Sequence, residues 1–566
     1  MKAKKSLISL VALVGVAGAS LAGCGQSSNN SAGSTAASNS PGGTVSSTPA
    51  DSSLTIGVDN GSPTFQDNFN PFAPGNRIGT SYIYEPLFFV NNINGKVTPW
   101  LGTNYTWQNN KTLVVTVRSG VQWNDGKPFS AADVAFTFNY LKKYPALDSQ
   151  GLWQVLSSVT ASGNKVTFKF KNPNVPTFYS IASTVIVPKH IWSTITDPTK
   201  QMMPNPVGTG PYMVGNFTPE QYTLKKNPTY WQADKVNVQT LVFPVLGNNQ
   251  TAALKLSSGQ WDWATLFLPN VQKTFVSKDP QYNKYWFPAG GVVSLALNLT
   301  KAPFNDVQFR QVLAYGINKQ EIAKQAEDGY VNVASQTGLI LPGQSKWLDP
   351  SIPNKGVYSY NLQKAKQMLA QAGYKTNSSG QLLDKSGKPI SFSIEVPNGW
   401  SDWIQTAQII QSNLKQLGIS VNVATPQYGA YSSSLSTGQF DGALMGFGGQ
   451  ASPFQAYNSL VNSQFALPVG QSTSQNQERF KDPSVDQVLA NWQKSTNQAT
   501  QQKDAYQVEQ AVFNQVPVIA LFYGATWSEF STKKFTGWPS ASDPYAPPAP
   551  YGQPPLMIFT HLQPRS

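Results

Sequence analysis

Few residues of this chain could carry out catalysis. Its 566 residues include two histidines, His190 and His561, and one cysteine, Cys24, so a histidine metal cluster, a histidine acid–base pair or an internal disulfide is not expected. The sequence also lacks the GxSxG, HExxH and P-loop motifs. A glycosidase needs only two carboxylates, and the sequence leaves that class open. We therefore predict a protein that is not an enzyme and that uses no metal and no other cofactor.

The thiol of Cys24 predicts a different chemistry, attachment to lipid. Residues 1–5 carry three lysines, and residues 6–20 form an uncharged, mostly apolar run that is too short to span a bilayer comfortably. Residues 21–24 then read Leu-Ala-Gly-Cys, which resembles the lipobox at which bacteria attach a diacylglycerol to cysteine. We expect a lipoprotein signal peptide at residues 1–23 and a lipid on Cys24 as the membrane anchor, because no later apolar run reaches about 18 residues.

Composition separates a tether from a globular body. Residues 24–53 are almost wholly Ser, Asn, Gly, Ala, Thr and Pro, which predicts a flexible linker. Over the whole chain 40% of residues are hydrophobic and only 12% are charged, the latter about half the usual share. The net charge is +13, but the lysines are dispersed, so nucleic acid is not an expected partner. The scarcity of carboxylates predicts an acidic working environment, with stability that varies little between about pH 3 and 7.

Capping residues predict where two helices begin. Ser130 can cap a helix whose first turn carries Asp133, where a carboxylate suits the exposed N–H groups. Within residues 303–326, either Asn305 or Asp306 can cap a second helix. The apolar stripe of that second helix consists of Phe309, Val312 and Leu313.

Alternating and apolar runs predict the strands. Residues 113–117 alternate like a half-buried strand, and residues 392–396 read as a buried one. A helix that ends at Gly418 follows the second run, and residues 419–423 and 442–447 are the next strands. A strand, a helix and a strand with short joins imply a parallel pair in an α/β lobe.

Six motifs follow one another along the chain: Tyr84–Leu87, Val121–Val134, Val207–Tyr212, Asn227–Trp231, Asn298 together with Pro303–Tyr315, and Val516–Ile519. They resemble, in the same order, those of the extracellular solute-binding protein family 5, which includes oligopeptide-, dipeptide- and nickel-binding receptors. Each is moderately specific alone, but six in order behind a lipobox are strongly specific. The resemblance covers the chain from about residue 54 to 566.

The resemblance implies an α/β fold of the periplasmic-binding-protein type, with two lobes, an additional domain and a hinge of two crossing strands near residues 295 and 515. The implied segments are 54–90, 205–295 and 515–566 for lobe one, 91–204 for the additional domain and 296–514 for lobe two. It also implies a substrate-binding lipoprotein on the extracytoplasmic face of the bacterial membrane. Such a protein closes on a small ligand and delivers it to the permease of an ABC importer.

The candidate ligand site departs from the peptide-binding members of the family. Those members commonly show Gly-Trp-x-Ala-Asp-Tyr-Pro-Asp-Pro, whose acid pairs with the ammonium group of the peptide. Residues 446–453 of this chain read Gly-Phe-Gly-Gly-Gln-Ala-Ser-Pro, with Gln450 nearest the position of the acid. Because a buried ammonium without a counter-charge is costly, either Asp402 replaces the acid or the ligand has no free amino terminus.

Aromatic residues keep a second ligand class open. The flat faces of four of them, beside polar groups, would suit sugars: Trp400, Trp403, Tyr428 and Phe447. Residues 68–72 and 84–88 also resemble the oligosaccharide-binding branch of the family. The alternative for each aromatic residue is a place in the core. We expect an oligopeptide receptor, with a receptor for cello- or β-gluco-oligosaccharides as the alternative.

Overall fold

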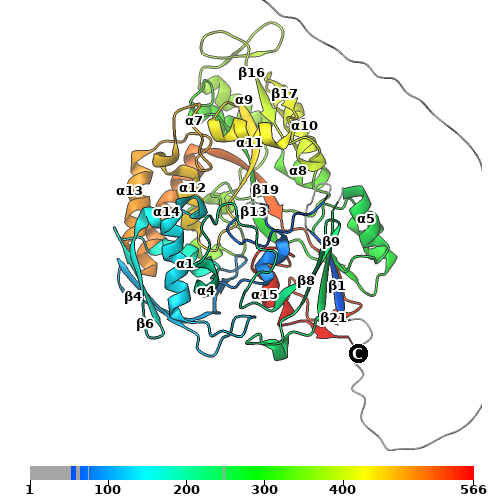
Figure 1. The fold of residues 1–566 in the computed structure, drawn as a ribbon. Helices are drawn as coiled ribbons and strands as arrows, with labels where there is room; N and C mark the ends of the chain where they lie inside the picture. Colours follow the sequence, from blue (N-terminus) through cyan, green and yellow to red (C-terminus); the bar gives the residue numbers. More distant parts are fainter. Residues whose placement is uncertain (1–51, 59–63, 74, 247–248, 566) are drawn as a thin grey trace, which may run out of the picture. The chain divides into compact units, whose positions relative to one another are not determined.

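The computed structural model describes residues 52–58, 64–73, 75–246 and 249–565. The predicted signal peptide, most of the predicted linker and the lipid attachment site at Cys24 lie outside these residues. Among the described residues, Figure 1 shows an α/β fold whose strands gather into separate sheets with helices around them.

A seven-stranded mixed sheet combines segments that are far apart in sequence. Its strand order is β12-β20-β11-β1-β10-β9-β8. The strands are β1 (Ser53–Gly57), β8 (Tyr212–Thr218), β9 (Gln221–Lys226), β10 (Thr240–Pro244), β11 (Trp263–Ala264), β12 (Asn283–Tyr285) and β20 (Glu529–Ser531). Strand β1 pairs in parallel with both β10 and β11, so the first described strand lies inside the sheet. The chain therefore returns to this sheet after more than two hundred intervening residues.

A four-stranded antiparallel sheet forms between β3 and β8 in sequence. It has the order β4-β5-β7-β6, with β4 (Gly102–Asn109), β5 (Thr112–Val117), β6 (Leu156–Ser162) and β7 (Lys165–Phe170). Helix α1 (Ala131–Lys143) packs against β6, and Ser130 and Asp133 form the predicted cap as a complete capping box. The second oxygen of Asp133 accepts a hydrogen bond from the Lys189 N–H at 3.0 Å, which also positions α4 (Lys189–Trp192).

The five-stranded sheet carries β13, the longest strand among the described residues. Its order is β17-β16-β18-β13-β19, with β13 (Ala289–Leu297), β16 (Ser391–Glu395), β17 (Ser420–Ala424), β18 (Gly442–Phe447) and β19 (Val518–Ala525). Strand β16 pairs in parallel with β17 and β18, which confirms the predicted parallel arrangement. Strand β13 pairs antiparallel with both β18 and β19.

Strands β13 and β19 connect the two larger sheets. Each leads directly from the five-stranded sheet to a segment of the seven-stranded one, β12 before β13 and β20 after β19. In Figure 1 they lie between the region of β16 and β17 and the region of β1, β8 and β9. Although the expected boundaries assign most of both strands to lobe one, both are hydrogen-bonded into the sheet that contains β18.

Helices cover both faces of the five-stranded sheet. Alternate residues of β18 point to opposite faces, so Leu444 packs with Phe309 and Ile410, whereas Ala443 and Met445 pack in a second core. The first face is covered by α7 (Val307–Gly316), α8 (Lys319–Gln325) and α10 (Ser401–Lys415), the second by α12 (Pro453–Val461), α13 (Pro483–Lys494) and α14 (Gln498–Gln515). The predicted helical segment 303–326 consists of two helices, α7 and α8, and Asp306 caps the first of them.

Shorter elements complete the described fold. The remaining helices are α2 (Leu152–Val155), α3 (Phe178–Ser183), α5 (Asn249–Ser257), α6 (Val271–Thr274), α9 (Leu362–Gln371), α11 (Tyr428–Thr437) and α15 (Pro554–Phe559). The remaining strands form two-stranded ladders: β2 (Phe88–Val90) with β3 (Val97–Pro99), β14 (Lys375–Thr376) with β15 (Leu382–Leu383), and β21 (Phe535–Thr536) with β22 (Gln563–Pro564).

The motif residue Glu85 is buried at the centre of a hydrogen-bond network. Its Oε1 accepts from Trp100 Nε1 at 2.5 Å, from the Tyr230 hydroxyl at 3.0 Å and from Trp231 Nε1 at 3.1 Å. Burial raises the pKa of Glu85 to about 7. The guanidinium of Arg118 lies 4.1 Å from the centroid of the Trp231 ring. Glu85 therefore joins the motifs Tyr84–Leu87 and Asn227–Trp231 in the interior of the fold.

Candidate functional site

Two cavities border the connecting strands β13 and β19. The first, which we call the Gln450 cavity, has a volume of about 420 Å³ and is lined by residues from several separate segments of the described fold. Ala289, Gly290 and Thr526 from the connecting strands and the segment after β19 contribute to its wall. The other lining residues are Val90 at the end of β2, Asn92, Ile93, Gln150 before α2, Tyr179 and Ser183 of α3, Ile340, residues 449–451 after β18, Gln455 of α12 and residues between Pro547 and Pro554. Such convergence of loops at strand ends is typical of ligand sites in α/β proteins.

Glycines shape the loop that carries Gln450. Gly448 and Gly449 have φ angles of +81° and +84°, in the left-handed region that favours glycine. A Cβ atom at Gly449 would also collide with the carbonyl oxygen of Gly290, so the loop lies directly against β13. This close approach places Gln450 in the wall of the cavity.

The side chain of Gln450 retains an unused acceptor. Its backbone carbonyl accepts a hydrogen bond from Gln344 Nε2 at 3.0 Å. Its side-chain Oε1 is buried and has no hydrogen-bond partner among the described residues. A buried acceptor without a partner costs free energy, which a ligand that donates a hydrogen bond would recover.

The second cavity, which we call the Trp400 cavity, has a volume of about 320 Å³. Trp400, Asp402 and Trp403 line it from the start of α10. The rings of Trp400 and Trp403 meet edge to face, with centroids 4.8 Å apart. Tyr428 stacks on Trp400 at 6.0 Å from outside the cavity and is 59% exposed. Burial raises the pKa of the Asp402 carboxyl, which lies in the first turn of α10.

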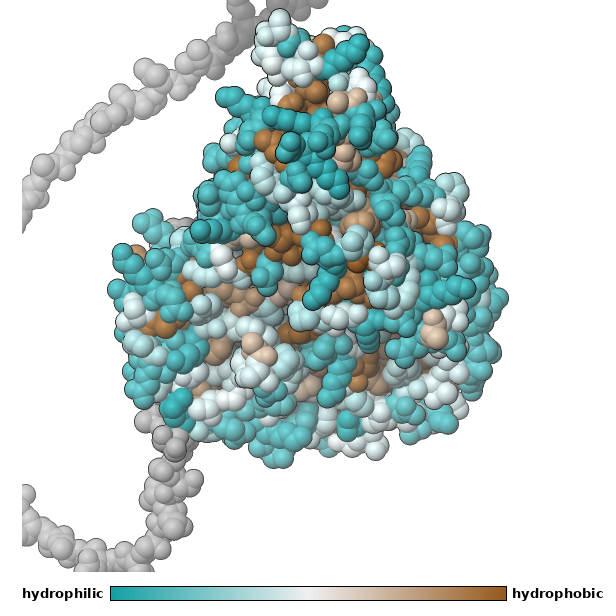
Figure 2. All heavy atoms as spheres, turned by 180° about the vertical axis from the view of Figure 1, so that it is seen from behind, coloured by the Kyte–Doolittle hydropathy of each residue, from teal (hydrophilic) through white to brown (hydrophobic). Residues whose placement is uncertain are grey.

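The six candidate ligand residues therefore do not meet in one cavity. Trp400, Asp402 and Trp403 share the Trp400 cavity, and Gln450 lines the other. Phe447, at the end of β18, lies beside Gly338. It is partly buried and packs against two hydrophobic core clusters. Figure 2 shows one face of the molecule, on which hydrophobic side chains gather across the middle and hydrophilic ones cover the margins.

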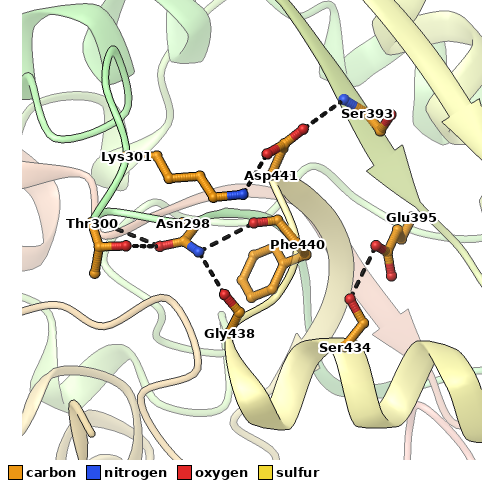
Figure 3. Close-up of polar contacts among 9 residues, drawn as sticks. All are labelled: Asn298, Thr300, Lys301, Ser393, Glu395, Ser434, Gly438, Phe440 and Asp441. Carbon is orange, nitrogen blue, oxygen red and sulfur yellow. Dashed lines mark hydrogen bonds and ion pairs between the residues drawn. The ribbon is translucent and has the colours of Figure 1, made fainter. Parts of the chain in front are cut away.

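A polar network at the turn before β18 fixes the position of this strand, which leads to Gln450. Asn298 Nδ2 donates to the carbonyl oxygens of Gly438 at 2.8 Å and of Phe440 at 3.2 Å, as Figure 3 shows. Lys301 Nζ lies 2.6 Å from Asp441 Oδ1. The motif residue Asn298 therefore attaches the end of β13 to the turn before β18, and it is a structural residue.

A carboxylate at the end of β16 lies next to this network. Glu395 accepts a hydrogen bond from the Ser434 hydroxyl at 3.0 Å, and its Oε2 is buried without a partner among the described residues. Burial raises the pKa of Glu395. It lines neither of the two cavities.

Sequence reasoning missed most residues of the Trp400 cavity, among them three large or charged side chains. Phe267, Glu327 and Trp527 line it together with the residues of α10. Phe267 and Trp527 flank the seven-stranded sheet, and Glu327 follows α8. Spacing along the chain carries no signal for such a meeting, because the three residues lie far apart in the sequence and only the fold brings them together.

Comparison with known proteins defines the class to which this architecture belongs. The profile described as bacterial extracellular solute-binding proteins, family 5 Middle, matches residues 96–466. The oligopeptide-binding protein AppA of Bacillus subtilis (strain 168) is 27% identical over 425 residues, which cover 72% of this chain and 75% of that relative. The nickel-binding periplasmic protein of Escherichia coli (strain K12) is 26% identical over 385 residues, 66% of this chain and 70% of that relative.

Solved structures agree with the sequence comparison. A periplasmic oligopeptide-binding protein of an oligopeptide ABC transporter from Thermotoga maritima has a TM-score of 0.85 and 28% identity, over 91% of this chain and 100% of that one. The mannohexaose-bound structure of that protein has a TM-score of 0.78 and 29% identity, over 91% and 99%. This chain belongs to the bacterial extracellular solute-binding proteins of family 5, and its fold is the two-lobed α/β fold of that family. No helix within the described residues has the length and apolar character needed to cross a membrane.

Proposed function

We propose that this protein captures oligopeptides outside the cell and delivers them to the permease of an ABC importer. The Gln450 cavity is the observation that carries the proposal. Its volume of about 420 Å³ lies within the roughly 300–1,000 Å³ of small-ligand sites, and several separate segments of the chain line it. The names of the Bacillus subtilis and Thermotoga maritima relatives support a peptide as the ligand.

The proposal includes a binding role without catalysis and an anchored location. Residues 1–23 act as the lipoprotein signal peptide, residues 24–53 form the linker, and the lipid on Cys24 holds the receptor at the extracytoplasmic face. The division into lobe one, the additional domain and lobe two follows the boundaries given above. The strands of the seven-stranded sheet support it, because all of them fall within the three segments of lobe one except Ser53, the first residue of β1.

An oligosaccharide is the second candidate ligand. The mannohexaose bound by the Thermotoga maritima protein and the open aromatic faces of Trp400 and Tyr428 favour it. Sugars commonly stack on such flat apolar faces beside polar groups, whereas a peptide would use the unpaired acceptor of Gln450.

A cavity-filling variant tests which site binds the ligand. Asn92 is exposed and lines the Gln450 cavity, so Asn92→Trp should fill part of it. Asn94→Trp is the matched control, because Asn94 is exposed two residues away and does not line that cavity. Calorimetry with tri- to pentapeptides should show binding by the wild type and the control, and weak or no binding by Asn92→Trp. Equal affinities in all three proteins would contradict the proposed site.

A further inference from the structure

The Trp400 cavity combines aromatic rings with carboxylates. Trp400 and Trp403 line one side, and Phe267 and Trp527 line another with their rings edge to face at 5.2 Å. Trp527 also meets Phe287 at 4.8 Å, which extends the aromatic wall behind the cavity. Among the described residues that line this cavity there is no lysine, arginine or histidine. Aromatic faces beside negative charge attract organic cations.

Glu327 provides the observation that points to a ligand. Its side chain lines the Trp400 cavity, is only 1% exposed, and its Oε1 has no hydrogen-bond partner among the described residues. Asp402 lines the same cavity, and Asp328 follows Glu327 in the sequence. A buried carboxylate without a partner is costly, and the negative charge of Asp402 adds to that cost.

The raised pKa of Glu327 agrees with a carboxylate that has no positively charged partner among the described residues of this cavity. Burial first, and then the charges of Asp402 and Asp328, raise the pKa of Glu327 to about 8. The carboxylate of Asp328 already accepts a hydrogen bond from the Asn270 N–H at 2.8 Å, so it has a partner elsewhere. A cation in the cavity would favour the ionised form of both Glu327 and Asp402.

We infer that the Trp400 cavity binds an ammonium or guanidinium group, held by the carboxylates of Glu327 and Asp402 and by the faces of the surrounding aromatic rings. The inference rests on the proposed peptide receptor and adds a specificity for cationic peptides. Val293 and Gly524 from β13 and β19 line this cavity, and Gly290 from β13 lines the Gln450 cavity. A peptide held along these strands would present its backbone to one cavity and a cationic group to the other.

Matched peptides measure this specificity directly. Alanine tetrapeptides with one lysine are compared by calorimetry with the same peptides carrying norleucine, each with a free and an acetylated amino terminus. The wild type should bind a peptide that carries a cationic group about tenfold more tightly than the matched peptide that lacks it. In the Glu327→Gln/Asp402→Asn double variant the preference should fall to within about twofold. Both substitutions keep the size of the side chain, and the melting temperature of the double variant verifies that it folds.

Control substitutions separate a local effect from a change in net charge. Glu220 and Asp234 are exposed and line neither cavity, so Glu220→Gln/Asp234→Asn should keep the preference for cationic peptides. Equal affinity of the wild type for cationic and neutral peptides, or a preference that survives in the Glu327 and Asp402 double variant, would overturn the inference.

A small probe keeps the test independent of the proposed function. If no peptide binds, the proposed peptide receptor fails, and choline is then compared with its neutral isostere 3,3-dimethyl-1-butanol. Binding of choline alone, lost in the Glu327→Gln/Asp402→Asn variant, would support a cation site in a receptor for another ligand. No difference between choline and the neutral alcohol would overturn the cation site as well.

Discussion

Gln344 Nε2 donates a hydrogen bond to the backbone carbonyl of Gln450 at 3.0 Å, and this bond fixes the loop after β18. The other end of the same amide, Gln344 Oε1, accepts from the Ile340 N–H at 3.0 Å. Gln344 is buried, the bond to Ile340 is buried with it, and the bond to Gln450 is partly buried. One side chain therefore ties two walls of the Gln450 cavity together, since Ile340 and Gln450 both line it.

The first prediction follows from this bond. Gln344→Leu should leave the Ile340 N–H and the Gln450 carbonyl unpaired and lower the free energy of unfolding by about 1–3 kcal/mol. It should also weaken ligand binding, because the Gln450 loop loses its attachment. Chemical denaturation and calorimetry measure the two effects. Gln320→Leu, at an exposed position, is the control, and equal affinities in the two variants would show that the bond does not organise the cavity.

A second prediction concerns the Glu85 network. Glu85→Ala should leave the donors on Trp100, Tyr230 and Trp231 without their acceptor and lower the free energy of unfolding by about 3–5 kcal/mol. Glu85→Gln keeps one acceptor oxygen and should cost less than the alanine variant. Urea denaturation provides the comparison. A loss below about 1 kcal/mol for Glu85→Ala would show that this network is not a major source of stability.

A third prediction concerns pH. Burial raises the pKa of several glutamates above the ordinary value of 4.5: Glu85 to about 7, and Glu327, Glu478 and Glu509 to about 8. Below pH 4.5 both the folded and the unfolded chain hold these protons. As the pH rises toward 8, the unfolded chain releases protons that the folded chain retains, so the free energy of unfolding falls.

The melting temperature should therefore be lower at pH 8 than at about pH 5. Aspartates with lowered pKa values, such as Asp306 and Asp482, act in the opposite direction and contribute stability that is lost only in stronger acid. Glu509→Gln, which removes one buried acid, should reduce the difference between pH 5 and 8. A melting temperature that rises over that range would contradict the assignment of these glutamates. These raised pKa values place part of the fall below pH 7, which differs from the small variation between about pH 3 and 7 that the scarcity of carboxylates predicts. Melting temperatures at pH 3, 5 and 7 decide between the two.

A fourth prediction concerns the anchor. Cys24→Ala removes the only thiol of the chain, so it should abolish lipid attachment and leave unprocessed or released protein. Two acyl chains on one cysteine suffice for stable retention at a membrane. Detergent-phase partitioning compares the variant with the wild type. Equal partitioning of the two fully processed proteins would show that Cys24 carries no lipid.

The sequence predicted those parts of the fold that short-range patterns determine. The cap formed by Ser130 and Asp133 and the strand at residues 442–447 were confirmed, because a cap and a short apolar run involve only neighbouring residues. The sequence could not predict that Trp400 and Gln450 line different cavities. That separation depends on the register between β13 and β18, in which Val292 pairs with Phe447, and on the turn made by Gly448 and Gly449.

Calorimetry of the purified full chain carrying Cys24→Ala, first freed of co-purified ligand, tests the central claim most directly. The proposed function predicts saturable binding of one peptide per chain for tri- to pentapeptides, and none for β-linked glucose or mannose oligomers. Asn92→Trp should abolish that binding, while Asn94→Trp should not. Saturable binding of the oligosaccharides with no heat from any peptide would contradict the peptide assignment and establish the sugar receptor in its place.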